Sequence, residues 1–127
     1  MSTTLIVILV LLHVKHFLAD FPLQNLYMLG KAKRGIDWIL PLGAHCAVHA
    51  TLSALIILAY KPQMVGLVVA EFFAHFVIDR LKCLYRLPHG TWAPEFRGKY
   101  LAKYYTAFGV DQLFHQLCYI TMAYFLA

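Results

Sequence analysis

Residues 5–20, LIVILVLLHVKHFLAD, begin as an unbroken apolar run and end with imidazole and charged side chains at helical spacing. The apolar part has the composition of a membrane-spanning helix, which needs about 20 mostly apolar residues. The histidines and the aspartate lie inside the expected span. Ionisable side chains inside a bilayer are costly, so they almost always face other protein groups and mark functional sites. This stretch therefore predicts a membrane helix with one inward polar face.

The composition of the whole chain favours a membrane protein over a soluble domain. Hydrophobic residues make up 61% of the 127 residues, whereas soluble domains have roughly 45–50%. This length predicts a single transmembrane domain covering residues 1–127. The net charge is +5, but most basic residues fall in two short stretches. That distribution indicates membrane topology rather than nucleic-acid binding.

Four apolar stretches are each long enough, at about 20 residues or more, to cross the hydrocarbon layer. Their approximate bounds are residues 5–27, 38–60, 64–85 and 105–126. The expected fold is an all-α membrane protein, a four-helix transmembrane bundle with up-down topology. A short interfacial helix before the fourth span is also expected, because aromatic residues recur there every four positions: Trp92, Phe96, Tyr100 and Tyr104.

The basic residues predict the orientation of the bundle. Lys31, Lys33 and Arg34 lie between the first and second spans, and the connection between the third and fourth spans is also basic. The positive-inside rule places both connections in the cytoplasm. Both termini then face outward. We expect the protein in a bacterial inner (plasma) membrane.

Ionisable residues recur at helical spacing in every span, so those of one span share a face. Counted from the cytoplasmic ends, one set lies roughly 10 Å deep and a second set lies one turn deeper. Glu71 falls in a third layer with His13, whereas Lys15 lies off the polar face and has no evident role. The agreement in depth predicts one shared site. Its eight candidate metal ligands are His16, Asp20, His45, His49, His75, Asp79, Asp111 and His115.

The chemistry of these side chains favours a divalent metal. Each acidic residue left facing lipid would cost about 2.5–3.5 kcal/mol, and a cation neutralises carboxylates while accepting neutral imidazoles. A mixed carboxylate and imidazole set suits zinc first, with iron or manganese as alternatives, and one or two ions. A metal-free proton or ion relay and a purely structural hydrogen-bond network remain open. A haem has little use for the acids.

Four segments resemble the signatures of a known family. They are HFLADFPLQ at residues 16–24, the pair His45 and His49, HFVID at residues 75–79 followed by Lys82, and DQLFH at residues 111–115. In this order they resemble the small membrane-protein family catalogued as domain of unknown function 3307. The layout is also loosely similar to families of proposed membrane-bound metal-dependent hydrolases.

The leading functional hypothesis is a membrane-embedded metal-dependent hydrolase acting on a lipid or lipid-linked substrate. The metal would activate a water molecule, Glu71 or an unligated carboxylate would act as general base, and Lys82 would bind a phosphate. The alternative is a small metal or proton transporter, or a metal-stabilised membrane interaction protein. The expected partners are the lipid bilayer and a lipid or lipid-phosphate substrate, without nucleic acid. A homo-oligomer is a further candidate, and a transporter this small would require one.

Overall fold

The computed structural model describes the backbone of residues 2–84 and 94–127, and the side chains of residues 2–84 and 101–127. Within these ranges the chain forms four α-helices and two short 3-10 helices, and no strand. The predicted all-helical fold is confirmed for this part of the chain. The elements are α1 (Thr3–Asp20), η1 (Met28–Ala32), α2 (Ile39–Tyr60), η2 (Pro62–Met64), α3 (Gly66–Leu84) and α4 (Pro94–Leu126).

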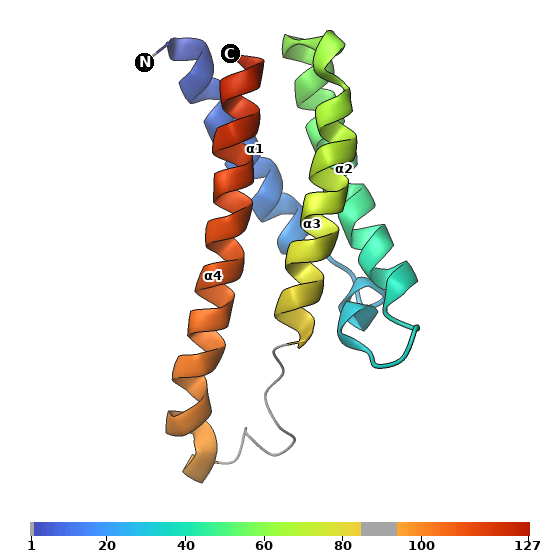
Figure 1. The fold of residues 1–127 in the computed structure, drawn as a ribbon, viewed down its shortest axis with the longest axis vertical. Helices are drawn as coiled ribbons and strands as arrows, with labels where there is room; N and C mark the ends of the chain where they lie inside the picture. The colour runs from blue at the N-terminus through green and yellow to red at the C-terminus, as the bar shows by residue number, and fades with distance from the viewer. Residues whose placement is uncertain (1, 85–93) are drawn as a thin grey trace.

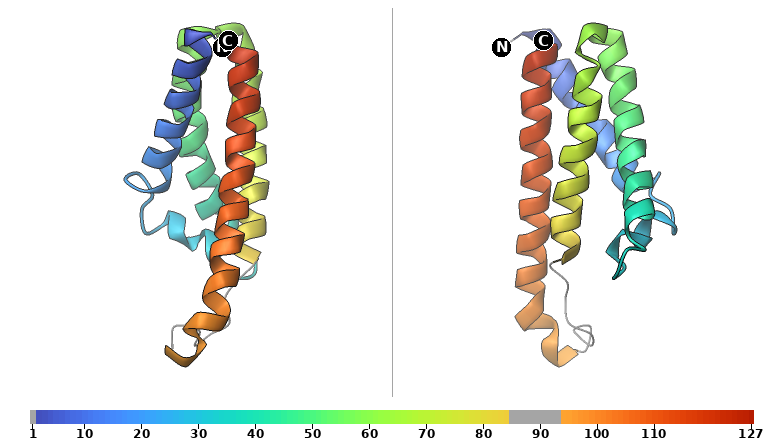
Figure 2. Two further views of the ribbon diagram at one scale, coloured as in Figure 1. Left: turned by 90° about the vertical axis from the view of Figure 1, so that its left-hand side faces the viewer. Right: turned by 45° about the vertical axis from the view of Figure 1, so that its right-hand side comes forward.

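The four α-helices lie side by side and alternate in direction (Figures 1 and 2). Helices α1 and α3 each pack against both α2 and α4. Both chain termini and η2 lie at one end of the bundle, and η1 lies toward the other end. Residues far apart in the sequence can therefore meet at equal depth inside the bundle.

Two helices are long and apolar enough to cross a membrane, α1 and α2. Buried helices of soluble proteins and signal sequences can meet the same criteria. Helix α3 carries Glu71, Asp79, Arg80 and Lys82, and these charges lower its average hydropathy. Hydropathy alone thus marks half of the bundle as candidate membrane spans.

Helix α1 is shorter than the predicted span of residues 5–27. It begins after Ser2, whose Oγ accepts a hydrogen bond from the Leu5 N–H at 3.2 Å, and it ends at Asp20. Pro22 explains this end, because proline lacks the N–H that would bond the Leu18 carbonyl, which accepts from the Leu23 N–H at 2.9 Å instead. Asp20 therefore lies at the carboxyl end of α1, where the chain turns away.

Helix η1 folds back against α2 and α3. Gly30 permits this close approach, because a Cβ atom there would lie only 3.0 Å from Cγ of Pro41. The segment that the sequence marks as a basic connection thus packs on the bundle. It carries Lys31 to within hydrogen-bond distance of Asp79 on α3.

Helix α4 is one continuous helix of 33 residues. The expected separate interfacial helix before the fourth span is therefore wrong for residues 94–104, which form the first turns of α4. Pro94 suits the first helical position, where its missing N–H has no intrahelical partner to lose. Trp92 and the predicted end of the third span at Tyr85 lie outside the described residues.

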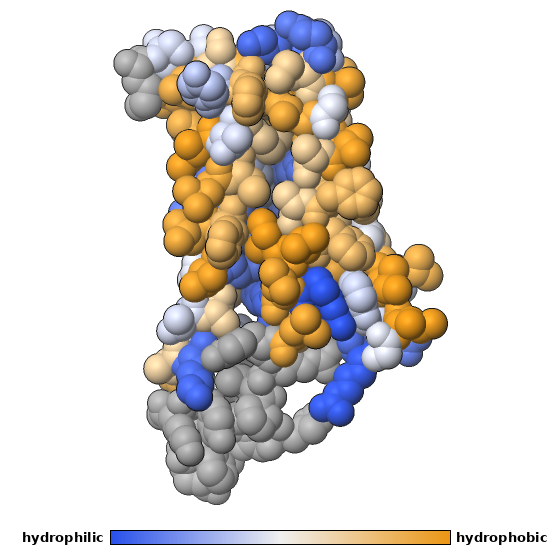
Figure 3. Space-filling model, viewed as in Figure 1, coloured by the Kyte–Doolittle hydropathy of each residue, from blue (hydrophilic) through white to orange (hydrophobic). Residues whose placement is uncertain are grey.

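An apolar core fills the end of the bundle near the termini. It comprises Ile8, Leu12, Ile57, Tyr119, Met122, Ala123 and Leu126. Burying a large aliphatic or aromatic side chain contributes about 1.5–3 kcal/mol, so this cluster holds α1, α2 and α4 together at that end, with Leu67 and Val68 of α3 packed against it. The outer surface is also largely hydrophobic across the middle of the bundle (Figure 3). Most buried ionisable groups lie beyond the apolar core, toward η1.

Candidate metal centre

Asp20 is the carboxylate on which three histidines converge. His16, one turn earlier on α1, places Nε2 3.2 Å from Oδ2 of Asp20. From α2, Nε2 of His49 lies 3.0 Å and Nε2 of His45 lies 3.3 Å from Oδ1 of Asp20. His45 and His49 are one turn apart, and both are fully buried. The helical spacing of each pair thus places all three rings around one carboxylate.

His75 of α3 brings a fourth ring to this group. It lies between His49 and His115, with ring centroids 3.8 and 3.9 Å away and interplanar angles of 34° and 31°. Adjacent imidazolium charges at such distances would repel strongly in a buried site. The stacking therefore favours neutral rings, and neutral imidazole is the form that binds metals.

A second set of ligand-type atoms continues from the first toward α4. Asp79 of α3 places Oδ2 3.2 Å from Nε2 of His45 and Oδ1 3.2 Å from Nε2 of His115. The same nitrogen of His115 lies 3.6 Å from Oδ1 of Asp111, one turn earlier on α4. His45 and His75 of the first set also lie close to Asp79 of the second set. The polar interior is therefore one contiguous cluster.

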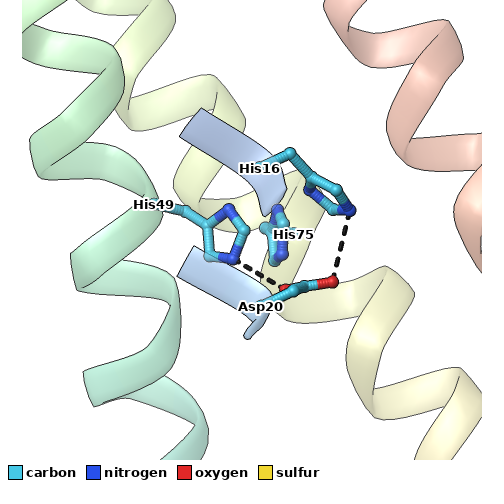
Figure 4. A group of neighbouring side chains, drawn as sticks. All are labelled: His16, Asp20, His49 and His75. Carbon is cyan, nitrogen blue, oxygen red and sulfur yellow. Dashed lines mark hydrogen bonds and ion pairs between the residues drawn. The ribbon is translucent and has the colours of Figure 1, made fainter. Parts of the chain in front are cut away.

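All eight predicted ligands fall within this cluster, in three overlapping groups. In each group the ligand atoms lie within 4.8 Å of one another, and Figure 4 shows the side chains of the first group pointing toward a common centre. Neighbouring ligands of a tetrahedral zinc, with bonds of 2.0–2.1 Å, are about 3.3 Å apart. The contacts between Asp20 and its histidines match that spacing. The groups are His16, Asp20, His49 and His75; His45, His75 and Asp79; and Asp79, Asp111 and His115.

Several buried atoms of the cluster have no hydrogen-bond partner among the described residues. They include Nε2 of His45, Nε2 of His75, Nδ1 of His49 and Oδ1 of Asp111. Nε2 of His45 is close to two carboxylates but lacks hydrogen-bond geometry to either. Buried polar atoms are nearly always paired in folded proteins. The donor set and its unpaired atoms fit a bound cation.

Three lysines neutralise carboxylates of the interior. Lys31 donates to Oδ2 of Asp79 at 2.7 Å, and Lys82 donates to Oδ2 of Asp111 at 2.9 Å. Lys15 pairs with Glu71, and both side chains are buried. Asp20, in contrast, has no lysine or arginine partner among the described residues. With neutral imidazoles, the interior has one more carboxylate than ammonium groups.

The structure revises two positions assigned from sequence. Lys15 lies inside the bundle, in the buried stripe of α1 formed with Ile8, Leu12 and Ala19, so its position off the His16 face does not place it outside. His13 is exposed, and its Nδ1 hydrogen-bonds the Leu9 carbonyl at 2.7 Å. The expectation that His13 shares the inward polar face of the first span is therefore wrong. The period of buried residues along α1 is the signal that identifies Lys15.

The two residues expected to act in catalysis lie on opposite sides of the cluster. Glu71 is 3% exposed and its carboxylate is paired with Lys15, which leaves it apart from the three ligand groups. Lys82 is partly buried, is paired with Asp111 and lines a groove between α3 and α4. Of the two, Lys82 has the more open setting.

Tyr119 is a further residue of the site that the sequence pattern did not single out. Its hydroxyl lies 2.9 Å from Nδ1 of His16, and its ring lies under the ammonium group of Lys15. It follows Asp111 and His115 on α4 at four-residue spacing, and that spacing could have identified it. A hydrogen bond at Nδ1 fixes the ring orientation and leaves Nε2 facing Asp20, the usual arrangement of a histidine that binds a metal.

The fold and this site together define an all-helical protein with buried histidine and aspartate clusters of metal-ligand type. The sequence profile of one family, described as Protein of unknown function (DUF3307), matches residues 8–127. The chain belongs to this family. Comparison with curated proteins and with solved structures gave no match.

Proposed function

We propose that the protein is a membrane-embedded metal-binding protein, and that it acts as a metal-dependent hydrolase on a lipid or lipid-linked substrate. The observation that carries this proposal is the convergence of eight histidine and aspartate side chains from four helices in one buried cluster. Helical bundles of di-metal proteins assemble carboxylate and imidazole ligands from facing helices in the same way. Zinc suits this donor set best, with iron or manganese next.

The lipid-facing surfaces of α3 and α4 support a membrane location for the whole bundle. Their carboxylates Glu71, Asp79 and Asp111 are buried, and most of their exposed positions are apolar: Val69, Phe73, Val77 and Leu81 on α3, and Val110, Leu113, Leu117 and Ile120 on α4. The exposed polar side chains described on α4 are Lys103, Thr106, Gln116 and Thr121. A bundle with polar groups inside and apolar groups outside matches the bilayer as solvent. We infer four membrane spans in a bacterial inner membrane, with both termini outside and the end near η1 in the cytoplasm.

The charge distribution favours one ion at the group formed by His16, Asp20, His49 and His75. Asp20 is the carboxylate without an ammonium partner among the described side chains, whereas Asp79 and Asp111 each have a lysine. A cation near Asp20 would compensate the excess negative charge of the interior. An isolated charge in a low-dielectric interior costs several kcal/mol, so this position gains most from the ion.

When bound, such an ion lowers the pKa of a water molecule toward 7 and polarises a phosphoryl or acyl oxygen. We assign proton transfer to Asp111 rather than Glu71. Asp111 lines the groove between α3 and α4, and its Oδ1 has no hydrogen-bond partner among the described residues. Glu71 is held by Lys15 and serves charge balance. Lys82, beside Asp111, is placed to hold an anionic group of the substrate.

The alternative functions are a transporter of metal ions or protons, and a metal-stabilised membrane interaction protein. A transporter needs polar continuity to both membrane faces. The apolar core at the end near the termini interrupts that continuity. This core favours a site with access from one side or from the lipid, as an enzyme requires.

The test is hydrolysis by the purified protein in detergent, with phospholipids and lipid-linked phosphates as substrates. We expect turnover that is lost on chelation and restored by zinc, iron or manganese. A metal-loaded protein that is inactive on all these lipids would favour the metal-stabilised membrane interaction protein. Metal uptake into protein-containing vesicles would favour the transporter.

A further inference from the structure

A groove runs along the outside of the bundle between α3 and α4. It has a volume of about 570 Å³. Most of its lining is apolar, with Val77, Ile78 and Leu81 from α3 and Val110 and Phe114 from α4. Val77, Leu81, Val110 and Phe114 are exposed on the surface that the proposed function places in the hydrocarbon. A lipid chain is therefore the natural apolar occupant of this groove.

The same groove has a cationic part. Lys82 and Lys103 both line it, together with Asp111 and Thr106. Lys82 is paired with Asp111 at 2.9 Å, whereas Lys103 is exposed and has no ion-pair partner among the residues whose side chains are described. Two ammonium groups thus face one carboxylate. The groove keeps an excess positive charge that suits an anion.

The two parts lie at different depths. Lys82 is near the end of α3, and Lys103 lies eleven residues before Phe114 on α4, a separation of roughly 16 Å along the helix. The cationic part thus extends from Lys103, at the end toward η1, to the ammonium group of Lys82 at Asp111, beside Val110. Apolar side chains continue past it to Val77 and Phe114, and this order matches an amphiphile with an anionic head and a hydrocarbon chain.

The groove also reaches the polar cluster. Asp111 lines the groove and belongs to the ligand-type group with Asp79 and His115. On its other side, Gln112 lies beside Asp111 and its Oε1 is 3.2 Å from Nε2 of His16. A head group held by Lys82 would thus contact the edge of the candidate metal centre. The groove is a lateral route from lipid to that centre.

We propose that this groove binds a phosphate-bearing lipid, with the phosphate on Lys82 and Lys103 and a hydrocarbon chain against Val77, Val110 and Phe114. This lipid is the substrate class of the proposed hydrolase, so the inference rests on that proposed function. A phosphate is favoured over a neutral head group because two ammonium groups face it. The hydrocarbon chain distinguishes the ligand from free phosphate.

The test is a binding titration of the full-length protein in detergent with fluorescent phosphatidic acid. Fluorescent diacylglycerol with the same chains lacks the phosphate, and inorganic phosphate serves as competitor. We expect tighter binding of phosphatidic acid than of diacylglycerol, and no competition by millimolar inorganic phosphate. Equal affinity for the two lipids, or full competition by phosphate alone, would overturn the proposal.

Variants assign the binding to the groove. Lys103→Met should weaken phosphatidic acid binding about fivefold, since one lysine near an anionic lipid contributes on the order of 1 kcal/mol. Val110→Trp should fill the apolar part and weaken binding with both lysines in place. Lys33→Met removes an exposed lysine outside the groove and is the matched control. Lys103 and Val110 are both exposed, so these variants do not depend on refolding of the buried cluster.

Metal content and hydrolysis measured on the same samples separate this inference from the proposed function. If lipid binding depends on the groove but the protein has neither metal nor turnover, the lipid site is supported and the hydrolase proposal is contradicted. Turnover with unchanged binding in both Lys103→Met and Val110→Trp would keep the hydrolase and overturn the groove assignment.

Discussion

Lys15 of α1 and Glu71 of α3 form an ion pair inside the bundle, with side chains that are 4% and 1% exposed. Removing one partner of a buried pair leaves an uncompensated charge and costs about 3–5 kcal/mol, whereas replacing both partners is often neutral or stabilising. The ion pair therefore determines whether a substitution at Glu71 raises or lowers the stability of the protein. A carboxylate in the bilayer would be costly alone, but here its loss leaves an ammonium group unpaired.

We expect Glu71→Gln and Lys15→Met each to lower the unfolding temperature in detergent, and the double variant to regain most of the loss. Thermal unfolding of the parent, both single variants and the double variant measures the coupling directly. Additive losses would show that the two side chains do not depend on each other. Metal content should stay near the parent value in all three variants, since neither residue belongs to a ligand group.

Tyr119 gives a second expectation, on metal affinity rather than stability. Tyr119→Phe keeps the ring in the apolar core but removes the hydroxyl that lies 2.9 Å from Nδ1 of His16. Loss of such a supporting hydrogen bond typically weakens metal binding by about 10- to 100-fold. Competition against a chelator of known affinity measures the change. A metal affinity equal to that of the parent would contradict the assignment of His16 as a ligand.

The variant Asp111→Asn distinguishes between two positions for the ion, the ligand group that contains Asp20 and the ligand group that contains Asp111. With the ion at the group containing Asp20, this variant should retain metal while hydrolysis falls about 100-fold or more, the usual contribution of a general base. Loss of metal in this variant would instead place the ion at Asp79, Asp111 and His115. Lys33→Met serves again as the exposed control, and metal and turnover are measured on the same preparation.

The orientation in the membrane can be tested independently of chemistry. Reporter fusions after Ala127 should give a periplasmic signal, and insertions in the connection that carries Lys31, Lys33 and Arg34 should give a cytoplasmic one. Because η1 packs on the bundle, insertions are best placed at Gly35, which has φ of 67° in an exposed turn. A cytoplasmic signal at Ala127 would reverse the bundle and place the metal centre nearer the outer face.

The membership of the cluster could be predicted from sequence because helical geometry determines it. His45 and His49 share a face by spacing alone, as do Asp111 and His115, and up-down packing brings equal depths together. The structure brings all eight predicted residues into one cluster on this basis. Their binding of a metal remains a prediction.

The lysine partners depend on tertiary contacts, and the sequence pattern did not reveal them. Lys31 reaches Asp79 because η1 folds back over Pro41, and no periodicity encodes such a turn. The inward position of Lys15 escapes the pattern for a different reason. The histidine spacing of α1 predicts one inward face, whereas the buried stripe passes through Ile8, Leu12, Lys15 and Ala19, about 100° around the helix from His16.

The helix ends are also only partly predictable from sequence. Helix α1 ends at Asp20 because of Pro22, but the apolar run that continues beyond Pro22 predicts a longer span. The sequence does not separate a continuous α4 from a short helix followed by a span, because Gly98 lowers the helix propensity where the two would join.

The most direct test of the metal-binding proposal is elemental analysis of the detergent-purified protein beside two histidine variants. His49→Ala removes a buried ring 3.0 Å from Asp20, and His13→Ala removes an exposed ring outside the ligand groups. We expect one zinc, iron or manganese ion per chain in the parent and in His13→Ala. In His49→Ala we expect a large loss of metal together with a lower unfolding temperature, because metal bound to the native state stabilises it. A parent that takes up none of these metals even when they are supplied, or equal metal in both variants, would contradict the metal centre.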